Sequence, residues 1–210
     1  ADNQARFEQL KAERAKHRYM GLDTEILGPE EIRKLTDGMV NLEGIIGALY
    51  DPLDGHLDPS GTTHAYAKAA RMGGAEIVLH NRVLETNPTK DGWEVVTEKG
   101  TVTCEHLVNA GGLWAREIGA MAGVYLPLLP MAHQYIVTEP SPLIKERQAK
   151  GLPEMGVLRE ADSSWYLREE NGGFVLGIYE KGAPCCYVDG PSEQSEYELF
   201  QGELDRLEPY

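Results

Sequence analysis

The stretch HLVNAGGLWAREIGAMAG, residues 106–123, has the pattern of a strand, a glycine turn and a helix. Its first part is apolar and predicts a short buried strand containing Leu107, Val108 and Ala110. Gly111 and Gly112 predict a turn, and a helix is expected to begin at Leu113 and Trp114. This order of elements is typical of an α/β protein.

The same turn suggests a binding site for an anion. Backbone N–H groups at the start of a helix have no acceptor within the helix, and glycine lets a ligand approach the backbone closely. Many α/β crossovers carry glycine at this position without binding any ligand, so a purely structural turn is the alternative.

The composition is that of an ordinary globular protein, with 41% hydrophobic and 26% charged residues among 210. A formal net charge of −14 argues against nucleic acid or an anionic membrane as a partner, because both would be repelled. An anionic substrate would need a local pocket rich in cations or N–H groups. Three cysteines and no long apolar run predict a reducing compartment, cytoplasmic or, in a eukaryote, the mitochondrial matrix.

Several kinds of reactive site have no matching motif. The six histidines form no His-x-x-x-His pair, so no metal site is expected. No Gly-x-Ser-x-Gly elbow indicates a serine nucleophile, and the dinucleotide fingerprint G-x-G-x-x-G is absent from the sequence. A nucleotide cofactor would therefore need a pyrophosphate loop that lies outside this chain.

Before the opening stretch, helices and strands alternate. Helices are expected over 2–20, 29–35 and 59–72, and strands over 24–27, 45–50, 75–79, 82–88, 93–97 and 101–104. Behind it, strands are expected at 134–139, 155–160, 164–169 and 173–180, with a polar loop to Gly151 and a helical tail over 193–210.

We therefore expect an α/β (α+β) fold with a mostly antiparallel sheet in the second half. The expected parts are a helical segment at 1–36, a region with a hairpin at 37–123, and the sheet with the terminal helix at 124–210.

The polar and aromatic residues of the second half include a lone histidine, His133, in the segment LLPMAHQYIV. A histidine in apolar surroundings is more often a hydrogen-bonded core residue than a catalytic one. Tyr166 and Arg168 alternate on one predicted strand, and Tyr179 lies on the next. Ordinary packing on a sheet face is the alternative for all of these residues.

Six segments occur in the order found in one family: YDPLDGHLDPSG, AEIVLHNRVLET, HLVNAGGLWAREIGAMAG, LPLLPMAHQYIVTEP, VLREADSSWYLRE and GIYE. The chain resembles the dimethylglycine and sarcosine dehydrogenases, FAD-dependent amine oxidoreductases with the D-amino-acid-oxidase-like fold. The resemblance implies that residues 37–123 are part of a Rossmann-like FAD-binding domain, on which the helical segment 1–36 packs, and that residues 124–210 form the substrate-binding sheet. The resemblance implies oxidation of an N-methyl glycine by hydride transfer to flavin N5, giving an iminium. That iminium is hydrolysed, or its one-carbon unit passes to tetrahydrofolate in a C-terminal domain.

The resemblance also implies roles for individual residues. His133 and Tyr166 match the active-site histidine and tyrosine, while Tyr179 would line the substrate pocket. Arg168 is a candidate for the substrate carboxylate on its charge alone. The expected FAD contacts match the second flavin-binding element and are Val83, Ala110, Gly111, Gly112 and Trp114.

The chain departs from the family pattern by lacking the fingerprint loop, the covalent flavin histidine and the folate domain. We therefore expect an internal fragment whose partners are the amine substrate and the rest of the same polypeptide, and which does not retain FAD alone. The alternatives are a free-standing small-molecule binding module that has lost catalysis, or a structural protein.

Overall fold

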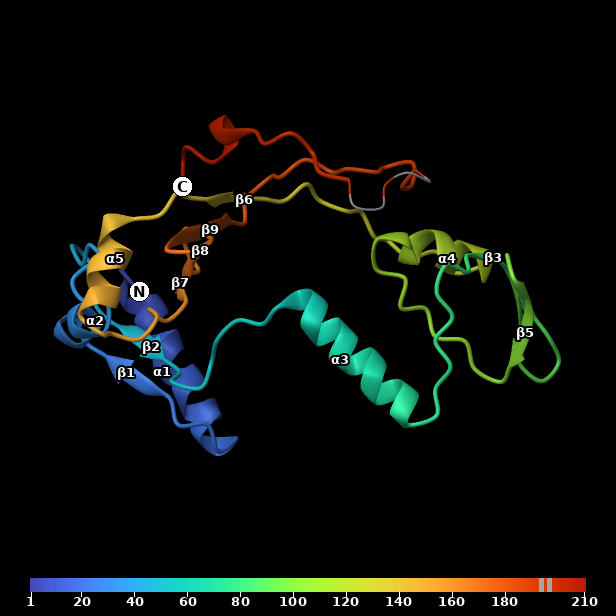
Figure 1. The fold of residues 1–210 in the computed structure, drawn as a ribbon, viewed down its shortest axis with the longest axis horizontal. Helices are drawn as coiled ribbons and strands as arrows, with labels where there is room; N and C mark the ends of the chain where they lie inside the picture. The colour runs from blue at the N-terminus through green and yellow to red at the C-terminus, as the bar shows by residue number, and fades with distance from the viewer. Residues whose placement is uncertain (193–194, 196–197) are drawn as a thin grey trace. The chain divides into compact units, whose positions relative to one another are not determined.

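The computed structural model describes residues 1–192, 195 and 198–210. The chain forms two compact units, whose elements are labelled in Figure 1. The first unit consists of Ala1–Leu57, His133–Glu180 and Glu203–Tyr210, and the second of Asp58–Ala132 and Lys181–Gly202.

The first unit begins with helix α1 (Gln4–Tyr19), which is capped at both ends. The side chain of Asn3 accepts a hydrogen bond from the Arg6 amide at 2.8 Å, and Gly21 has a φ of +80°, which glycine tolerates better than other residues. Strands β1 (Glu25–Leu27) and β2 (Ala48–Tyr50) pair antiparallel beside it, and α2 (Pro29–Leu35) follows β1. The predicted helices here are confirmed. Of the strand predicted over 45–50, only the last three residues form a strand.

A four-stranded antiparallel sheet forms the rest of the first unit. Its strands are β6 (Gln134–Val137), β7 (Leu158–Glu160), β8 (Trp165–Glu170) and β9 (Gly173–Ile178), in the order β6-β9-β8-β7. The β8–β9 turn has positive φ at Asn171 (49°) and Gly172 (79°), as a tight hairpin requires. The predicted antiparallel sheet is confirmed.

The loop predicted before Gly151 is instead helix α5 (Pro142–Ala149). Ser141 caps it by accepting from the Leu143 amide at 3.3 Å, and Pro142 presets its first turn. Ile144 is fully buried, so tertiary packing stabilises a short segment whose few apolar residues form no clear helical period.

A buried ion pair joins α5 to the sheet. Arg147 Nε lies 3.6 Å from Glu169 Oε1, and the two side chains are only 5% and 9% exposed. The guanidinium also donates to the carbonyls of Pro153 (3.0 Å) and Leu35 (3.3 Å), while the carboxylate accepts from the Met155 amide at 2.7 Å. One arginine thus connects α5, β8, the loop before β7 and the end of α2.

The second unit contains helix α3 (Pro59–Met72), the meander β3 (Val83–Pro88), β4 (Trp93–Thr97) and β5 (Gly100–Cys104), and the pair η1 (Gly112–Trp114) and α4 (Ala115–Met121). The Asp58 side chain caps α3 by accepting from the Gly61 amide at 2.7 Å. Helix α4 packs against β3, and Val95 is buried in the meander. The predicted helix at 59–72, hairpin and glycine-turn helix are confirmed.

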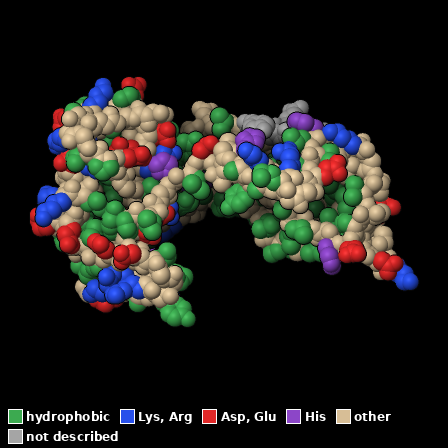
Figure 2. All heavy atoms as spheres, turned by 60° about the horizontal axis from the view of Figure 1, so that its bottom comes forward, with side chains coloured by type: hydrophobic (Ala, Val, Ile, Leu, Met, Phe, Trp, Pro, Cys, Tyr) green, Lys and Arg blue, Asp and Glu red, His purple; other side chains and the backbone are tan. Residues whose placement is uncertain are grey.

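Two predicted strands are wrong. Residues 75–79 and 106–110 have no regular secondary structure, and within the described chain neither pairs with a strand. Val108 is 82% exposed and Leu79 62% exposed, and Figure 2 shows such apolar side chains at the surface. An apolar run becomes a strand only when a neighbour completes its hydrogen-bond ladder, which composition alone does not reveal.

The predicted helical tail is also wrong wherever the structure describes it. Residues 198–203 form no helix, and only the single turn η2 (Leu204–Arg206) follows; residues 193–194 and 196–197 lie outside the described part. The backbone of Glu203 exchanges two 3.0 Å hydrogen bonds with the Gln134 side chain, which holds this segment extended. Of the helices described, none has the length and apolar character needed to cross a membrane.

Candidate active site

The predicted catalytic residues meet on one face of the four-stranded sheet. The rings of His133 and Tyr179 stack with centroids 4.9 Å apart and an interplanar angle of 15°. Tyr166 lies on the adjacent strand β8, and its ring centroid is 5.9 Å from that of Tyr179. Residues two apart on a strand share a face, so Gly177 brings Tyr179 onto the face of Tyr166, its register partner. Tyr179 is therefore the central residue of this aromatic cluster.

His133 is exposed, and its imidazole has no hydrogen bond to any group that the structure describes. The core role that the sequence left open for this histidine is therefore not the one observed. A ring that is supported by stacking and free at both nitrogens is available to a ligand.

Gly177 makes room for the tyrosine ring. A Cβ atom at this position would lie 2.0 Å from Tyr166 Cε1 and 2.5 Å from its hydroxyl oxygen. Real side chains do not approach so closely, so only glycine allows the ring to lie across β9.

A hollow of about 440 Å³ opens over this part of the sheet. Tyr166 and Tyr179 contribute to its wall, together with Arg159, Arg168 and the loop residue His56. This volume falls within the range of small-molecule pockets, about 300–1,000 Å³.

The cations of the hollow differ in what they already bind. The Arg168 guanidinium is hydrogen-bonded to the Glu170 carboxylate and to the Glu169 carbonyl, the latter at 3.1 Å. His56 Nε2 lies 3.9 Å from Glu154 Oε1. Arg159, by contrast, is exposed and has no hydrogen bond or ion pair to a described group.

A second ion pair involves Glu180, the residue that follows Tyr179 in the chain. The two carboxylate oxygens of Glu180 accept from Arg206 at 2.8 and 2.7 Å. The hydrogen bonds from Arg206 lower the pKa of Glu180, and the nearby His133 adds a smaller effect in the same direction. Because the Glu180 side chain is only 6% exposed, this pair fixes the end of β9 to the C-terminal segment.

The pair predicts a pH dependence of stability. The Glu180 pKa is lowered from its ordinary value of 4.5, so its contribution is present above that pH and is lost as the pH falls through the folded-state pKa. We expect wild type to melt above Glu180→Gln at neutral pH, and the difference to shrink as the pH falls below about 4.5. Thermal unfolding from pH 3 to 7 measures this. Glu43→Gln, at an exposed carboxylate without an ion partner in the described chain, should show no such convergence.

The glycine turn lies in the second unit. A Cβ at Gly111 would lie 2.4 Å from Ile118 Cδ1, so this glycine allows the turn to pack on α4. Gly112 has a φ of +54°, and nothing lies within 4 Å of where its Cβ would be. The amides of Gly112 and Leu113 have no acceptor among the described groups. Two free N–H groups beside open space fit an anionic ligand.

Two of the other predicted cofactor residues adjoin this turn in the chain, and the third, Val83, lies on β3. Ala110 is exposed and Trp114 half-buried, at the two ends of the turn. Val83 begins β3, where the pairing with β4 is interrupted by a bulge between Val83 and Glu85.

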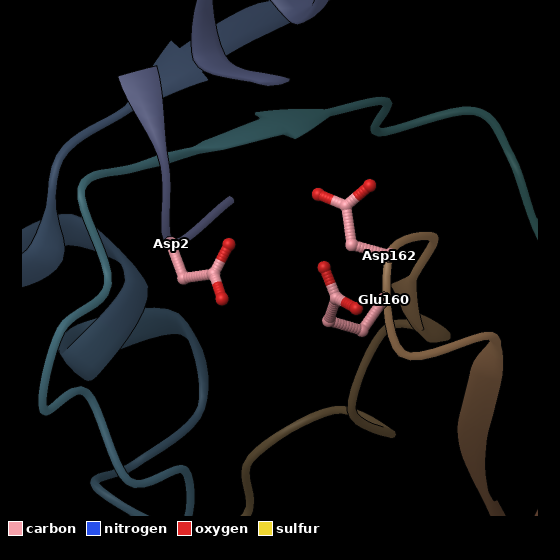
Figure 3. Close-up of side chains that lie close together, drawn as sticks. All are labelled: Asp2, Glu160 and Asp162. Atoms are coloured by element: carbon pink, nitrogen blue, oxygen red, sulfur yellow. The ribbon is translucent and has the colours of Figure 1, made fainter. Parts of the chain in front are cut away.

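An acidic cluster adjoins the hollow at the β7–β8 turn of the first unit. Oxygen atoms of Asp2, Glu160 and Asp162 lie within 4.8 Å of one another. Figure 3 shows the three side chains close together. Arg6 donates to the Asp162 carboxylate, and Asn3 Nδ2 donates to Asp2 and Asp162, each at 3.0 Å. These bonds link the start of α1 to the β7–β8 turn.

Residues 1–209 match the family described as FAD dependent oxidoreductase. The chain belongs to this family. The family assignment agrees with the resemblance seen in the sequence segments.

Relatives within the family are similar along nearly the whole chain. The mitochondrial dimethylglycine dehydrogenase of Mus musculus is 36% identical over 99% of this chain, and the mitochondrial sarcosine dehydrogenase of the same species 32% identical over 98%. The chain spans only 24% and 22% of their lengths. The crystal structure of L-proline dehydrogenase from P. horikoshii superposes with a TM-score of 0.72 and 26% identity, over 87% of this chain and 48% of that one.

The sequence alone missed three contributors to the site. Gly177 and Arg159 lie on the strands predicted at 173–180 and 155–160, and Arg206 lies in the predicted helical tail. Each acts through a residue on another element, so sequence spacing gives no indication of its role.

Proposed function

We propose that the chain is the substrate-binding part of a flavin-dependent enzyme that oxidises N-methyl glycines, dimethylglycine or sarcosine. The observation that carries the proposal is the cluster of His133, Tyr179 and Tyr166 on one sheet face beside an open hollow. The similarity to a dimethylglycine and a sarcosine dehydrogenase supports this substrate class.

The roles follow from the chemistry of the residues. An amine must lose its proton before it becomes a good hydride donor, and the exposed imidazole of His133 is suited to accept that proton. The Tyr166 hydroxyl has no partner among the described groups and is placed to hydrogen-bond the substrate. Tyr179 supports His133 by stacking, and it forms the pocket wall together with Arg168.

FAD supplies the hydride acceptor when it is bound. We propose that the free amides of Gly112 and Leu113 would donate hydrogen bonds to its phosphate or ribityl oxygens. Ala110, Gly111 and Trp114 would shape the turn that presents these amides. The backbone of Val83 would contact the adenine edge. The pyrophosphate fingerprint loop, and a tetrahydrofolate domain to receive the one-carbon unit, are proposed for other parts of the protein. Its proposed location is the mitochondrial matrix in a eukaryote, by analogy with its mitochondrial relatives.

Substitution of the two proposed catalytic residues tests this function. In the flavin-loaded full-length protein, His133→Ala and Tyr166→Phe should each lower kcat/KM for dimethylglycine by about 10²-fold, because positioned proton transfer contributes on that order. Bound flavin, measured by its visible absorbance, should remain at the wild-type amount. Anaerobic flavin bleaching by dimethylglycine and sarcosine measures the reaction.

Exposed residues of the same types serve as controls. His64→Ala and Tyr19→Phe change exposed side chains that line no part of the hollow, and both should retain wild-type rates. Full activity in both His133→Ala and Tyr166→Phe would contradict the proposed roles. Binding of dimethylglycine by a wild-type protein that does not oxidise it would instead favour a binding module without catalysis.

A further inference from the structure

An arginine that has no role in the proposed proton chemistry lies beside Tyr166. Arg159 on β7 is the register partner of Tyr166 on β8, and directly paired residues of an antiparallel sheet project from the same face. Both residues line the 440 Å³ hollow. Strand β7 is the edge of the sheet, so Arg159 flanks Tyr166 on the side opposite Gly177.

Arg159 is an arginine of this hollow whose guanidinium has no partner among the described residues. Over residues 1–192, 195 and 198–210, its guanidinium makes no hydrogen bond or ion pair. Arg168 is bonded to the Glu170 carboxylate, which neutralises most of its charge. Of the acids nearby, Glu160 lines the hollow but its carboxylate accepts from the Ser163 amide in the β7–β8 turn.

The overall charge makes such a group necessary for an anionic substrate. A formal net charge of −14 repels carboxylates from the surface in general, so binding requires a local cation. A guanidinium offers two parallel N–H donors that match the two oxygens of a carboxylate.

We infer that Arg159 binds the carboxylate of the substrate and makes the site selective for amino acids over neutral amines. In an N-methyl glycine a single carbon separates the carboxylate from the amine, so an acid held by Arg159 keeps its nitrogen near the Tyr166 hydroxyl. The inference rests on the proposed function and assigns to Arg159 the anchoring role that charge alone had suggested for Arg168.

Two probes that carry either a carboxylate or a neutral carboxamide at the same position test this inference. N,N-dimethylglycine and its neutral amide, N,N-dimethylglycinamide, are titrated calorimetrically into the flavin-containing full-length protein without oxygen, and flavin reduction by each is followed separately. Arg159→Gln should weaken binding of the acid by about 30- to 100-fold, the range of a charge-assisted hydrogen-bonded pair, and leave the amide within about threefold. Arg159→Lys, which keeps the charge but not the two-pronged geometry, should fall between.

The outcomes separate the inference from the proposed function. An Arg159→Gln protein that keeps the wild-type preference for the acid, or a wild type that binds acid and amide equally, would overturn the inference. A wild type that binds the acid through Arg159 but reduces no flavin would contradict the proposed reaction and retain the carboxylate site. Arg18→Gln, at an exposed arginine of α1 that has no partner in the described chain and lies outside the hollow, should keep the wild-type preference.

Discussion

Replacing Arg147 by alanine should lower the free energy of unfolding by about 3–5 kcal/mol, the cost of leaving one member of a buried ion pair alone. Arg147 and Glu169 are 5% and 9% exposed, so water does not compensate the remaining carboxylate. The substitution also leaves the carbonyls of Leu35 and Pro153 without their donors. Urea unfolding at neutral pH measures the loss.

A double substitution separates the pair from its packing. Arg147→Met combined with Glu169→Leu removes both charges and keeps most of the volume, and we expect it to recover most of the stability that Arg147→Ala loses. Arg18→Ala, at an exposed arginine without a partner in the described chain, should change stability by less than about 0.5 kcal/mol. An Arg147→Ala protein as stable as this control would show that the ion pair does not contribute to the free energy of unfolding.

Gly177→Ala should lower kcat/KM for dimethylglycine by about 10²-fold or more, because displacing a reacting group by about 1 Å has effects of that size. The added methyl group would lie 2.0 Å from Tyr166 Cε1, so the ring must leave its position across β9. Overpacking should also cost about 1–3 kcal/mol of stability. Bound flavin should be retained, since the proposed cofactor contacts lie in the second unit.

A second glycine of the first unit provides the matched control. Nothing lies within 4 Å of a Cβ placed on Gly156, one residue after the buried Met155, so Gly156→Ala should keep both activity and stability. In a Tyr166→Ala background, Gly177→Ala should cost much less stability than in wild type, because the atoms that it meets are gone. Equal costs in the two backgrounds would show that the clash is not with Tyr166.

Much of the fold was predictable because its determinants are local. Asn3, Asp58 and the Gly28-Pro29 pair mark helix starts by hydrogen bonding or fixed φ, and Asn171-Gly172 supplies the positive φ of a hairpin. These effects act within a few residues, so sequence alone contains them.

The incorrect predictions share a physical cause. Helix α5 is held by burial of Ile144 and Arg147 against distant residues, and the tail is held extended by Gln134. Conversely, 75–79 and 106–110 have strand composition without a paired strand in the described chain. Packing and pairing decide these segments more strongly than propensity does.

The sequence by itself determined the family, the antiparallel character of the second half, and the histidine and tyrosines that are candidates for the site. Only the tertiary structure decided that Tyr179 stacks on His133, that Gly177 makes room for Tyr166, and that Arg159 rather than Arg168 has no acidic partner among the described residues. The physical reason is that strand register brings together residues far apart in the chain, and register depends on pairing across the whole sheet.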